Sequence, residues 1–437
     1  MPHPPADDCE SLRSSARRTA EAGLADDASE LYRKLLSSRA DDLEALNFLG
    51  IHAMAYGRFP VARELLERAL LVAPADGATR KNLGITLLQS GEPEAARQLL
   101  LQAVADAPGF FTARLYLALA YERLGQPNEA LAEYFRAITS AQSEGYWLSP
   151  ASTPTGLRPV VEHATRFVRA GHRRLLHAVL APLHARHGRD AMARVDQCLS
   201  GYLGEIACKP ENPAQRPTFL YFPGLPEIPI LPRELFPWYE QMEASTDAIR
   251  NELLAVLSAD ADLEPFLGEP PPGMKSDYLT TSRDDAKAQW DGLFFHRHGR
   301  RNEENCQRCP ATAAALEAAP IVHIRDHSPE GLFSVLGAGS HILPHTGMTN
   351  TRLVTHLPLL VPGDCALRVA DQRHDWQQGR CVTFDDTFEH EAWNNSDRTR
   401  VILLFDIWNP HLTEIERIAL TELVPAIGNL TGEQIAG

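Results

Sequence analysis

The sequence predicts an α-helical repeat domain followed by a β-rich domain of the sandwich or jelly-roll class. Two observations predict this order. Small residues recur every 34 positions in the first third of the 437-residue chain, and short apolar runs separated by Gly, Pro and Asp recur in its last quarter. The first pattern is typical of stacked helical hairpins, and the second of short strands joined by turns.

The helical repeats are predicted from coupled columns of small residues. Two such columns are Gly23, Gly57, Gly91 and Gly125, and Ala28, Ala62, Ala96 and Ala130. Small residues let antiparallel helices approach closely, Gly separates the two helices, and Pro residues such as Pro74 and Pro108 stop the second helix. This period is that of tetratricopeptide repeats, so we predict about four repeats over residues 8–141, with an irregular helical bundle as the alternative.

A break rich in Ser, Pro and Gly follows the repeats, and helix-like sequence resumes over about 160–206. We therefore assign residues 142–215 to a helical extension or linker. One further helix is expected over roughly 239–259. The β-rich domain is placed at 216–425, and five apolar runs in it are expected to be strands: GLFSVL, TRLVTHLPLLV, CALRVA, GRCVTF and TRVILLFDIW.

Composition excludes several classes of protein. The formal net charge of -15 provides no broad basic surface, so nucleic acid is not an expected partner. No apolar run approaches the roughly 18 to 20 residues of a membrane span, and the N-terminal residues lack the order of a signal peptide, so we expect a cytoplasmic protein. The seven cysteines are an odd, scattered set that fits reduced thiols, and Cys306 and Cys309 form a lone CxxC without a second pair for zinc.

Two histidines stand out in the β-rich part, His345 in LPHTGMTN and His390 in FEHEAWN. Two imidazoles on different strands suit iron, zinc or copper, and two histidines with one carboxylate mark an iron(II) oxygenase. In the usual HxD or HxE arrangement the carboxylate follows two residues after the first histidine, where this protein has Gly347. Glu389 and Glu391 flank His390 and would point away from its face of a strand. These residues alone leave both a metal site and ordinary buried or surface histidines open.

From about Trp290 to Pro410 the sequence resembles the catalytic domain of the aspartyl/asparaginyl β-hydroxylases. The resemblance is carried by GRRNE, PHTGMTN, FDDTFEHEAWN and a strand arginine ten residues after the second histidine. This family holds iron with two histidines and lacks the third protein ligand, so Gly347 agrees with it. The resemblance implies a double-stranded β-helix, or cupin-like jelly roll, and a reaction that uses iron(II), 2-oxoglutarate and dioxygen. The family's animal peptide hydroxylase also carries tetratricopeptide-like repeats before its catalytic domain.

The resemblance also implies roles for individual residues. His345 and His390 correspond to the iron ligands. Arg400 and Ser334 correspond to the pair that holds the distal carboxylate of 2-oxoglutarate, and His356 to the residue near its metal-proximal carboxylate. The residues themselves agree in one respect: Arg400 opens a strongly apolar strand, where an unpaired guanidinium is costly unless a carboxylate offsets it. A structural ion pair or an exposed strand end is the alternative for Arg400.

Arg352 and Val354 bear on the substrate. Arg352 shares strand parity with His356, so it is a candidate to anchor substrate or cosubstrate, with a surface arginine as the alternative. Val354 stands where the peptide hydroxylases have a second arginine, which weakens the assignment of an aspartyl or asparaginyl peptide as substrate.

We therefore predict an iron(II)- and 2-oxoglutarate-dependent dioxygenase that hydroxylates a carbon of a side chain, foremost by aspartyl or asparaginyl β-hydroxylation of a protein or peptide recruited by the repeats. A hydroxylase of a free amino acid or a small or lipid-linked acid is the first alternative. A catalytically inactive repeat scaffold is the second. A zinc enzyme is disfavoured because no third protein ligand or general base is evident near the two histidines.

Overall fold

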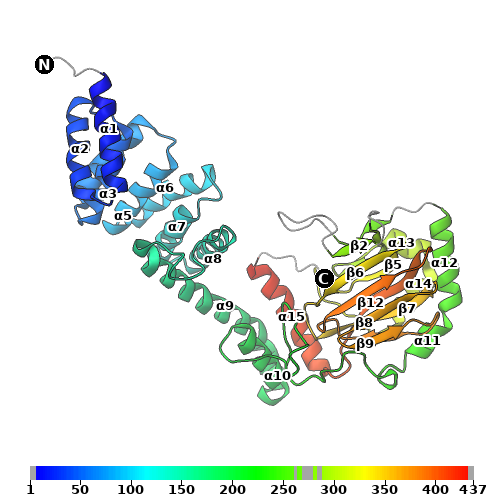
Figure 1. The fold of residues 1–437 in the computed structure, drawn as a ribbon. Coiled ribbons are helices and arrows are strands. Elements are labelled where there is room, and N and C mark those ends of the chain that lie inside the picture. Colours follow the sequence, from blue (N-terminus) through cyan, green and yellow to red (C-terminus); the bar gives the residue numbers. More distant parts are fainter. Residues whose placement is uncertain (1–5, 260–262, 268–278, 283–287, 432–437) are drawn as a thin grey trace. The chain divides into compact units, whose positions relative to one another are not determined.

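A computed structural model describes residues 6–259, 263–267, 279–282 and 288–431 of the protein (Figure 1). The protein forms two compact units, Met1–His172 and Arg173–Gly437. Each unit has its own buried core. The division between them falls inside the segment for which we predicted a helical extension.

The first unit consists of helices that pack on one another in sequence order. They are α1 (Ala6–Glu21), α2 (Ala25–Ser38), α3 (Leu43–Ala55), α4 (Phe59–Val72), α5 (Gly77–Gln89), α6 (Pro93–Asp106), α7 (Phe111–Arg123) and α8 (Pro127–Ser143). A short 3-10 helix, η1 (Thr155–Leu157), precedes the long helix α9 (Arg158–His187), which continues into the second unit. The predicted helical repeats are confirmed.

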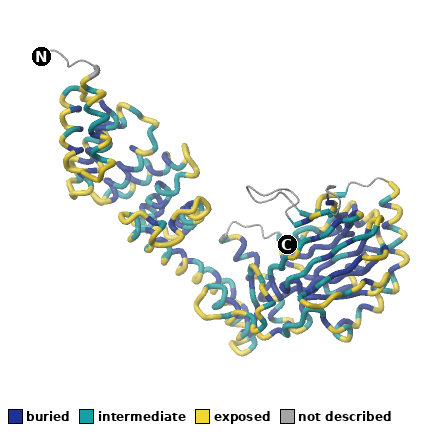
Figure 2. Tube along the Cα trace, in the orientation of Figure 1, coloured by how far each residue is buried: buried dark blue, intermediate teal, exposed yellow. Residues whose placement is uncertain are grey.

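The columns of small residues have two structural causes. The column of Gly23, Gly57, Gly91 and Gly125 has positive φ angles of 79°, 68°, 81° and 72°, which turn the backbone between paired helices. The alanine column is fully buried. Figure 2 shows buried stretches alternating with exposed ones along the helices of the first unit. Gly84, which belongs to neither column, lets α5 and α6 approach each other closely, because a Cβ atom at Gly84 would lie 2.7 Å from Leu100 Cγ. The sequence period therefore reports both the turns and the contacts between helices.

The second unit contains helices from both ends of its sequence. Beyond α9 they are α10 (Arg189–Tyr202), η2 (Arg233–Leu235), α11 (Tyr239–Ala244), α12 (Thr246–Ser258), α13 (Glu303–Arg308), α14 (Pro310–Ala318) and α15 (Glu414–Thr431). The helix expected over 239–259 is interrupted at Ser245, so it forms α11 and α12. Helix α10 packs against α15, although the two are more than two hundred residues apart in the sequence.

The described strands of the second unit form two antiparallel sheets. The larger sheet has the order β1 (Glu264–Pro265), β3 (Trp290–Arg297), β5 (Gly331–Leu336), β12 (Arg400–Trp408), β7 (Arg352–Leu360) and β10 (Val382–Phe384), with β4 (Arg300–Arg301) beside β3. The smaller sheet has the order β2 (Thr280–Ser282), β6 (Ser340–His345), β11 (His390–Asn394), β8 (Cys365–Val369) and β9 (Gln372–Asp375). The predicted order of helical repeats followed by an antiparallel β domain is confirmed.

All five predicted strands are present, with GRCVTF reduced to its last three residues. Four longer strands, β3, β6, β9 and β11, were not predicted. Both β6 and β11 contain histidines and other polar residues that break the apolar pattern. The two strands that carry the candidate histidines were therefore the hardest to recognise from local sequence.

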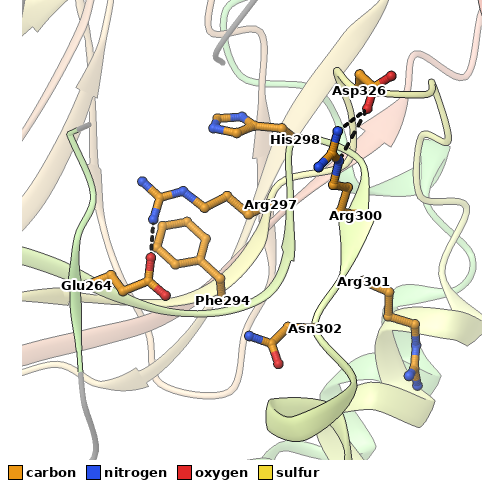
Figure 3. Close-up of a pocket in the computed structure, with 8 residues that line it drawn as sticks. All are labelled: Glu264, Phe294, Arg297, His298, Arg300, Arg301, Asn302 and Asp326. Atoms are coloured by element: carbon orange, nitrogen blue, oxygen red, sulfur yellow. Dashed lines mark hydrogen bonds and ion pairs between the residues drawn. The ribbon is translucent and has the colours of Figure 1, made fainter. Parts of the chain in front are cut away.

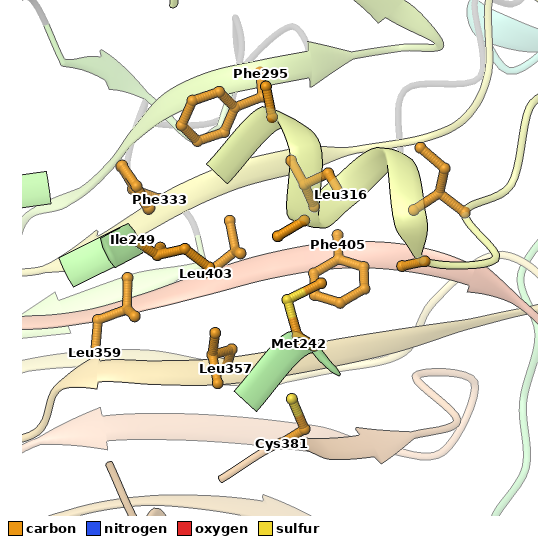
Figure 4. Packing of buried hydrophobic residues seen from close by; sticks show 14 of the residues in the cluster. Met242, Ile249, Phe295, Leu316, Phe333, Leu357, Leu359, Cys381, Leu403 and Phe405 are labelled. Carbon is orange, nitrogen blue, oxygen red and sulfur yellow. The ribbon is translucent and has the colours of Figure 1, made fainter. Parts of the chain in front are cut away.

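Strand alternation divides the buried residues of the larger sheet into two sets. On β12, Leu403 and Phe405 join Met242 of α11 and Ile249 of α12 in the core that covers the outer face of the sheet (Figure 4). Their neighbours on β12 face the cavity on the other side of the sheet: Arg400, Ile402, Leu404 and Asp406. The helices therefore fix the sheet from outside and leave its inner face for the site.

Candidate functional site

A cavity of about 270 Å³ is lined by residues of both sheets of the second unit. Strands β5, β7 and β12 contribute from the larger sheet, and β6, β8 and β11 from the smaller one. All six residues singled out from the sequence line this cavity: Ser334, His345, Arg352, His356, His390 and Arg400. The fold thus brings together residues whose strands are far apart in the sequence.

The two histidines face each other across neighbouring strands. His345 ends β6, His390 begins β11, and the two are direct partners in the antiparallel register, with ring centroids 4.1 Å apart. Nδ1 of His345 lies 2.8 Å from the carbonyl oxygen of Leu343, and Nδ1 of His390 lies 3.1 Å from that of Phe388. A backbone carbonyl can only accept, so Nδ1–H donates in both rings. In the neutral form of such a ring Nε2 carries the lone pair, which is the form that binds a metal ion.

Burial favours neutral histidines in the cavity. Burial, with a smaller contribution from the charge of His345, lowers the pKa of His390 to about 3. Burial and then the nearby Arg400 guanidinium hold the pKa of His356 well below its usual value. The ring of His356 lies 5.0 Å from that of Phe384, between centroids, and its Nδ1 has no hydrogen-bond partner among the described residues. Both rings are therefore uncharged at neutral pH, and His356 has a polar atom available to a ligand.

Asp386 supplies a carboxylate that the sequence patterns did not reveal. Gly347 has no side chain, and a Cβ atom added there would overlap the Asp386 carboxyl group. The N–H of Gly347 also donates a hydrogen bond to the carbonyl oxygen of Asp386 at 2.6 Å. Burial raises the pKa of Asp386, while Arg352 and His345 act in the opposite direction. An available signal was the FDDTF sequence that runs into FEHEAWN, where two aspartates interrupt a buried segment.

Arg352 is already paired within the protein. Its Nη1 lies 2.8 Å from Asp406 Oδ1 and 3.4 Å from Asp386 Oδ2, and its side chain is only 10% exposed. Burial would lower the pKa of Arg352, but Asp406 and Asp386 outweigh burial and raise it. Arg352 is therefore not a surface arginine. Its role as an anchor for substrate or cosubstrate stays a prediction, since much of its charge is offset by these two aspartates.

Arg400 is the opposite case, a buried guanidinium without a carboxylate partner among the described residues. It is 1% exposed, and its Nη1 donates to the carbonyl oxygen and hydroxyl of Ser334 at 3.2 and 3.4 Å. The guanidinium carbon lies 5.0 Å from the ring centroid of Trp376, and burial lowers the pKa of Arg400 to about 10. Trp290 also donates to the Ser334 hydroxyl at 3.1 Å. A buried cation held only by neutral groups is suited to an anionic ligand.

The residues present fit a metal held by two protein ligands. In the part of the protein that the structure describes, no group of three or more His, Cys, Asp or Glu side chains is arranged to hold a metal ion. Three buried polar atoms of the same cavity nevertheless lack a hydrogen-bond partner: Arg400 Nε, His356 Nδ1 and Asp386 Oδ1. Buried polar atoms are normally paired, so their convergence indicates a polar or charged ligand beside the two histidines.

A larger cavity, of about 460 Å³, lies elsewhere in the second unit and contains neither histidine (Figure 3). Arg297 pairs with Glu264 and packs over the Phe294 ring, while Arg300 donates to Asp326 at 2.8 Å. Its other charged groups pair with residues outside the cavity, Arg301 with Glu317 and His298 with Glu330. The smaller cavity, where polar atoms remain unpaired, is therefore the candidate site.

Two other sequence observations fall outside this site. Cys306 in α13 and Cys309 between α13 and α14 are free thiols buried in the core, and burial raises the pKa of Cys309 to about 11. No helix within the described residues is both long and apolar enough to cross a membrane.

Two family models match the sequence. Residues 243–410 match the model described as aspartyl/asparaginyl beta-hydroxylase, and residues 15–78 and 81–145 match tetratricopeptide repeats. The first range contains every candidate site residue. The second covers the glycine and alanine columns of the helical repeats.

Two curated relatives match part of the sequence. The ornithine lipid ester-linked acyl 2-hydroxylase of Rhizobium tropici is 34% identical over 194 residues, which cover 44% of this chain and 64% of that protein. Human aspartyl/asparaginyl beta-hydroxylase is 37% identical over 135 residues, covering 31% of this chain and 18% of that protein. The match thus spans less than two thirds of either relative. A crystal structure of MamA is 24% identical, covers 31% of this chain and 80% of its own, and has a TM-score of 0.29.

Proposed function

We propose that this protein, in which a segment matching the aspartyl/asparaginyl beta-hydroxylase model follows tetratricopeptide repeats, is an iron(II)- and 2-oxoglutarate-dependent hydroxylase. The observation that carries the proposal is the pairing, in one cavity, of two opposed histidines with a buried arginine that has no carboxylate partner among the described residues. His345 and His390 fit a metal ion, and Arg400 fits the far carboxylate of a dicarboxylic cosubstrate.

The protein residues in this proposal bind and orient. When bound, iron(II) and 2-oxoglutarate supply, with dioxygen, the oxidation that converts a substrate C–H bond to C–OH and yields succinate and carbon dioxide. His345 and His390 hold the metal through Nε2, with their rings fixed by Nδ1–H bonds to backbone carbonyls. Arg400 and Ser334 bind the distal carboxylate. His356 is neutral, so it can hydrogen-bond near the metal without adding positive charge.

Asp386 and the apolar lining complete the proposed site. With Gly347 in place of a carboxylate residue, the Asp386 carboxyl group lies in the same cavity as the histidines, and Arg352 Nη1 lies 3.4 Å from its Oδ2. Side chains such as Phe384, Ile402 and Leu404 exclude water from the cavity. Water exclusion strengthens the electrostatic interactions that orient the ligands.

The names of the two relatives indicate two classes of substrate. The human protein's name describes aspartyl and asparaginyl residues, and that of the Rhizobium tropici protein an ester-linked acyl group of a lipid. For the first class we propose that the tetratricopeptide repeats recruit a protein target, since such repeats present extended binding surfaces. For the second class the repeats would not be needed for turnover.

Anaerobic titration with iron(II) and 2-oxoglutarate tests the proposed function. We expect a weak visible charge-transfer band in the wild-type protein and none in His390→Ala. His341→Ala is the matched control, because His341 lies on β6 but pairs with Glu391 away from the cavity. A folded wild-type protein without the band, or a band that survives in His390→Ala, would overturn the proposal. Absence of the band would favour the inactive scaffold.

A further inference from the structure

The part of the cavity left for a substrate is predominantly apolar. If Ser334, His356 and Arg400 bind the cosubstrate and His345 and His390 the metal, most remaining lining side chains among the described residues are hydrocarbon or aromatic. They are Phe266, Leu267, Leu279, Trp290, Ile342, Met348, Val354, Leu367, Phe384, Ala392, Ile402 and Leu404. Contact with such a wall stabilises a bound hydrocarbon chain, because apolar surface is removed from water. The same wall offers an ion little solvation.

The charged lining residues do not favour an acidic substrate. Among the described residues that line the cavity, the arginines are Arg352 and Arg400, and lysine is absent. Arg352 pairs with Asp406 and Asp386, and Arg400 is assigned to the cosubstrate. Glu330 adds a third carboxylate to this lining and accepts a hydrogen bond from the N–H of His298 at 2.6 Å. A substrate carboxylate would meet three carboxylates and no unpaired cation among these residues.

Val354 lies among the apolar and charged residues that line this cavity. It sits on β7 between Arg352 and His356 in the inward-facing set, opposite Asp406 on β12 and Phe384 on β10. It is 7% exposed and packs with Phe384 and Leu367 in the inner core. A cation at this position would reach a substrate carboxylate close to the histidines, and valine supplies only methyl groups.

We infer that the substrate presents an uncharged alkyl or acyl chain to the two histidines, rather than an aspartyl side chain. This inference rests on the proposed function, because the metal and cosubstrate residues are those assigned there. The substrate class is therefore a long-chain acyl compound whose reacting methylene carries no neighbouring ionised carboxylate.

Ligand binding tests the inference without turnover. The full-length protein is loaded with manganese(II) and 2-oxoglutarate, and calorimetry measures three probes. The first is N-decanoyl-N-methylglucamine below its micelle concentration. The second is the same molecule with a carboxylate at the end of its acyl chain, and the third is a short peptide with one aspartate. We expect the first probe to bind at least tenfold more tightly than either acidic probe.

Two variants of Val354 extend the test. Val354→Arg should weaken binding of the uncharged probe and strengthen binding of the carboxylate-ended probe, reversing the preference by tenfold or more. Val354→Met is the matched control and should keep the wild-type preference, because it changes side-chain size without adding charge. Thermal stabilisation by 2-oxoglutarate reports whether each variant is folded.

The outcomes separate the inference from the proposed function. If 2-oxoglutarate fails to bind the manganese-loaded protein, the proposed function fails. If 2-oxoglutarate binds but an acidic probe binds as tightly as the uncharged one, or no acyl probe binds, only the inference is overturned. The wild-type comparison decides this even if Val354→Arg does not fold.

Discussion

The carboxyl group of Asp386 occupies the space that a side chain at residue 347 would fill. Gly347 and Asp386 lie in different segments, and the N–H of Gly347 donates to the carbonyl oxygen of Asp386. The absence of a side chain at 347 is therefore a packing requirement. Any substitution there must move a buried carboxylate that Arg352 holds.

Gly347→Ala should destabilise the β domain by about 1–3 kcal/mol, because the added methyl group overlaps Asp386 and cannot be accommodated without displacing it. Denaturant unfolding and metal titration measure the effect. Gly363→Ala is the control, since a Cβ atom there meets nothing within 4 Å. Adding Asp386→Ala should relieve part of the cost of Gly347→Ala. Equal effects of the two glycine substitutions would contradict this account.

Arg400→Met should leave the ligand-free protein as stable as wild type or more stable. The buried guanidinium lacks a carboxylate partner among the described residues, so removing it also removes a desolvated charge. The stabilisation that 2-oxoglutarate confers on wild type should be lost in the same variant. Thermal unfolding with and without 2-oxoglutarate measures both effects. A large loss of stability without ligand would mean that Arg400 is a structural residue.

Arg352→Met should behave differently, although it changes the same residue type in the same cavity. It leaves Asp406 and Asp386 buried without their shared cation, which costs about 3–5 kcal/mol of unfolding free energy. Denaturant unfolding of the two methionine variants, side by side, gives the comparison. Equal stability of Arg352→Met and Arg400→Met would show that the pairing contributes little.

The stability of the β domain should depend on pH through Asp385. Burial raises the pKa of this carboxyl to about 7, against an unfolded value near 4. The folded state therefore holds a proton that the unfolded protein has released. The stability contributed by that proton is complete below pH 4 and is lost as the pH rises through about 7.

Asp385→Asn should remove this dependence. Gln215 donates to Asp385 Oδ2 at 2.7 Å while its own Oε1 has no partner, so rotation of the amide would satisfy asparagine. Unfolding free energy measured from pH 4 to pH 8 should fall more steeply in wild type than in the variant. Parallel curves would show that Asp385 does not titrate in this range.

Gly84→Ala should destabilise the first unit, despite the better helix propensity of alanine. The new Cβ would lie 2.7 Å from Leu100 Cγ, and Leu100 is fully buried. Overpacking of this kind costs about 1–3 kcal/mol. Limited proteolysis of the helical repeats reports the effect, and 2-oxoglutarate binding should be unchanged. Gly109→Ala meets nothing within 4 Å and is the control, so equal proteolysis of both variants would contradict the prediction.

The sequence by itself determined the helical repeats and the β-rich domain, and it singled out His345, His390 and Arg400 as candidate site residues. Repeat period, strand alternation and motif spacing are local properties, so they can be read along the sequence. The strands β6 and β11 were missed because polar residues such as His341, His345, His390 and Glu391 break their apolar pattern.

Only the tertiary structure decided how these residues are paired. It placed Asp386 in the space beside Gly347, gave Arg352 two aspartates and left Arg400 without a carboxylate among the described residues. These relationships depend on the register of antiparallel strands that are distant in sequence. A one-residue shift would turn each side chain to the opposite face of its sheet. Charge pairing in the cavity is therefore set by sheet register, which local sequence patterns do not encode.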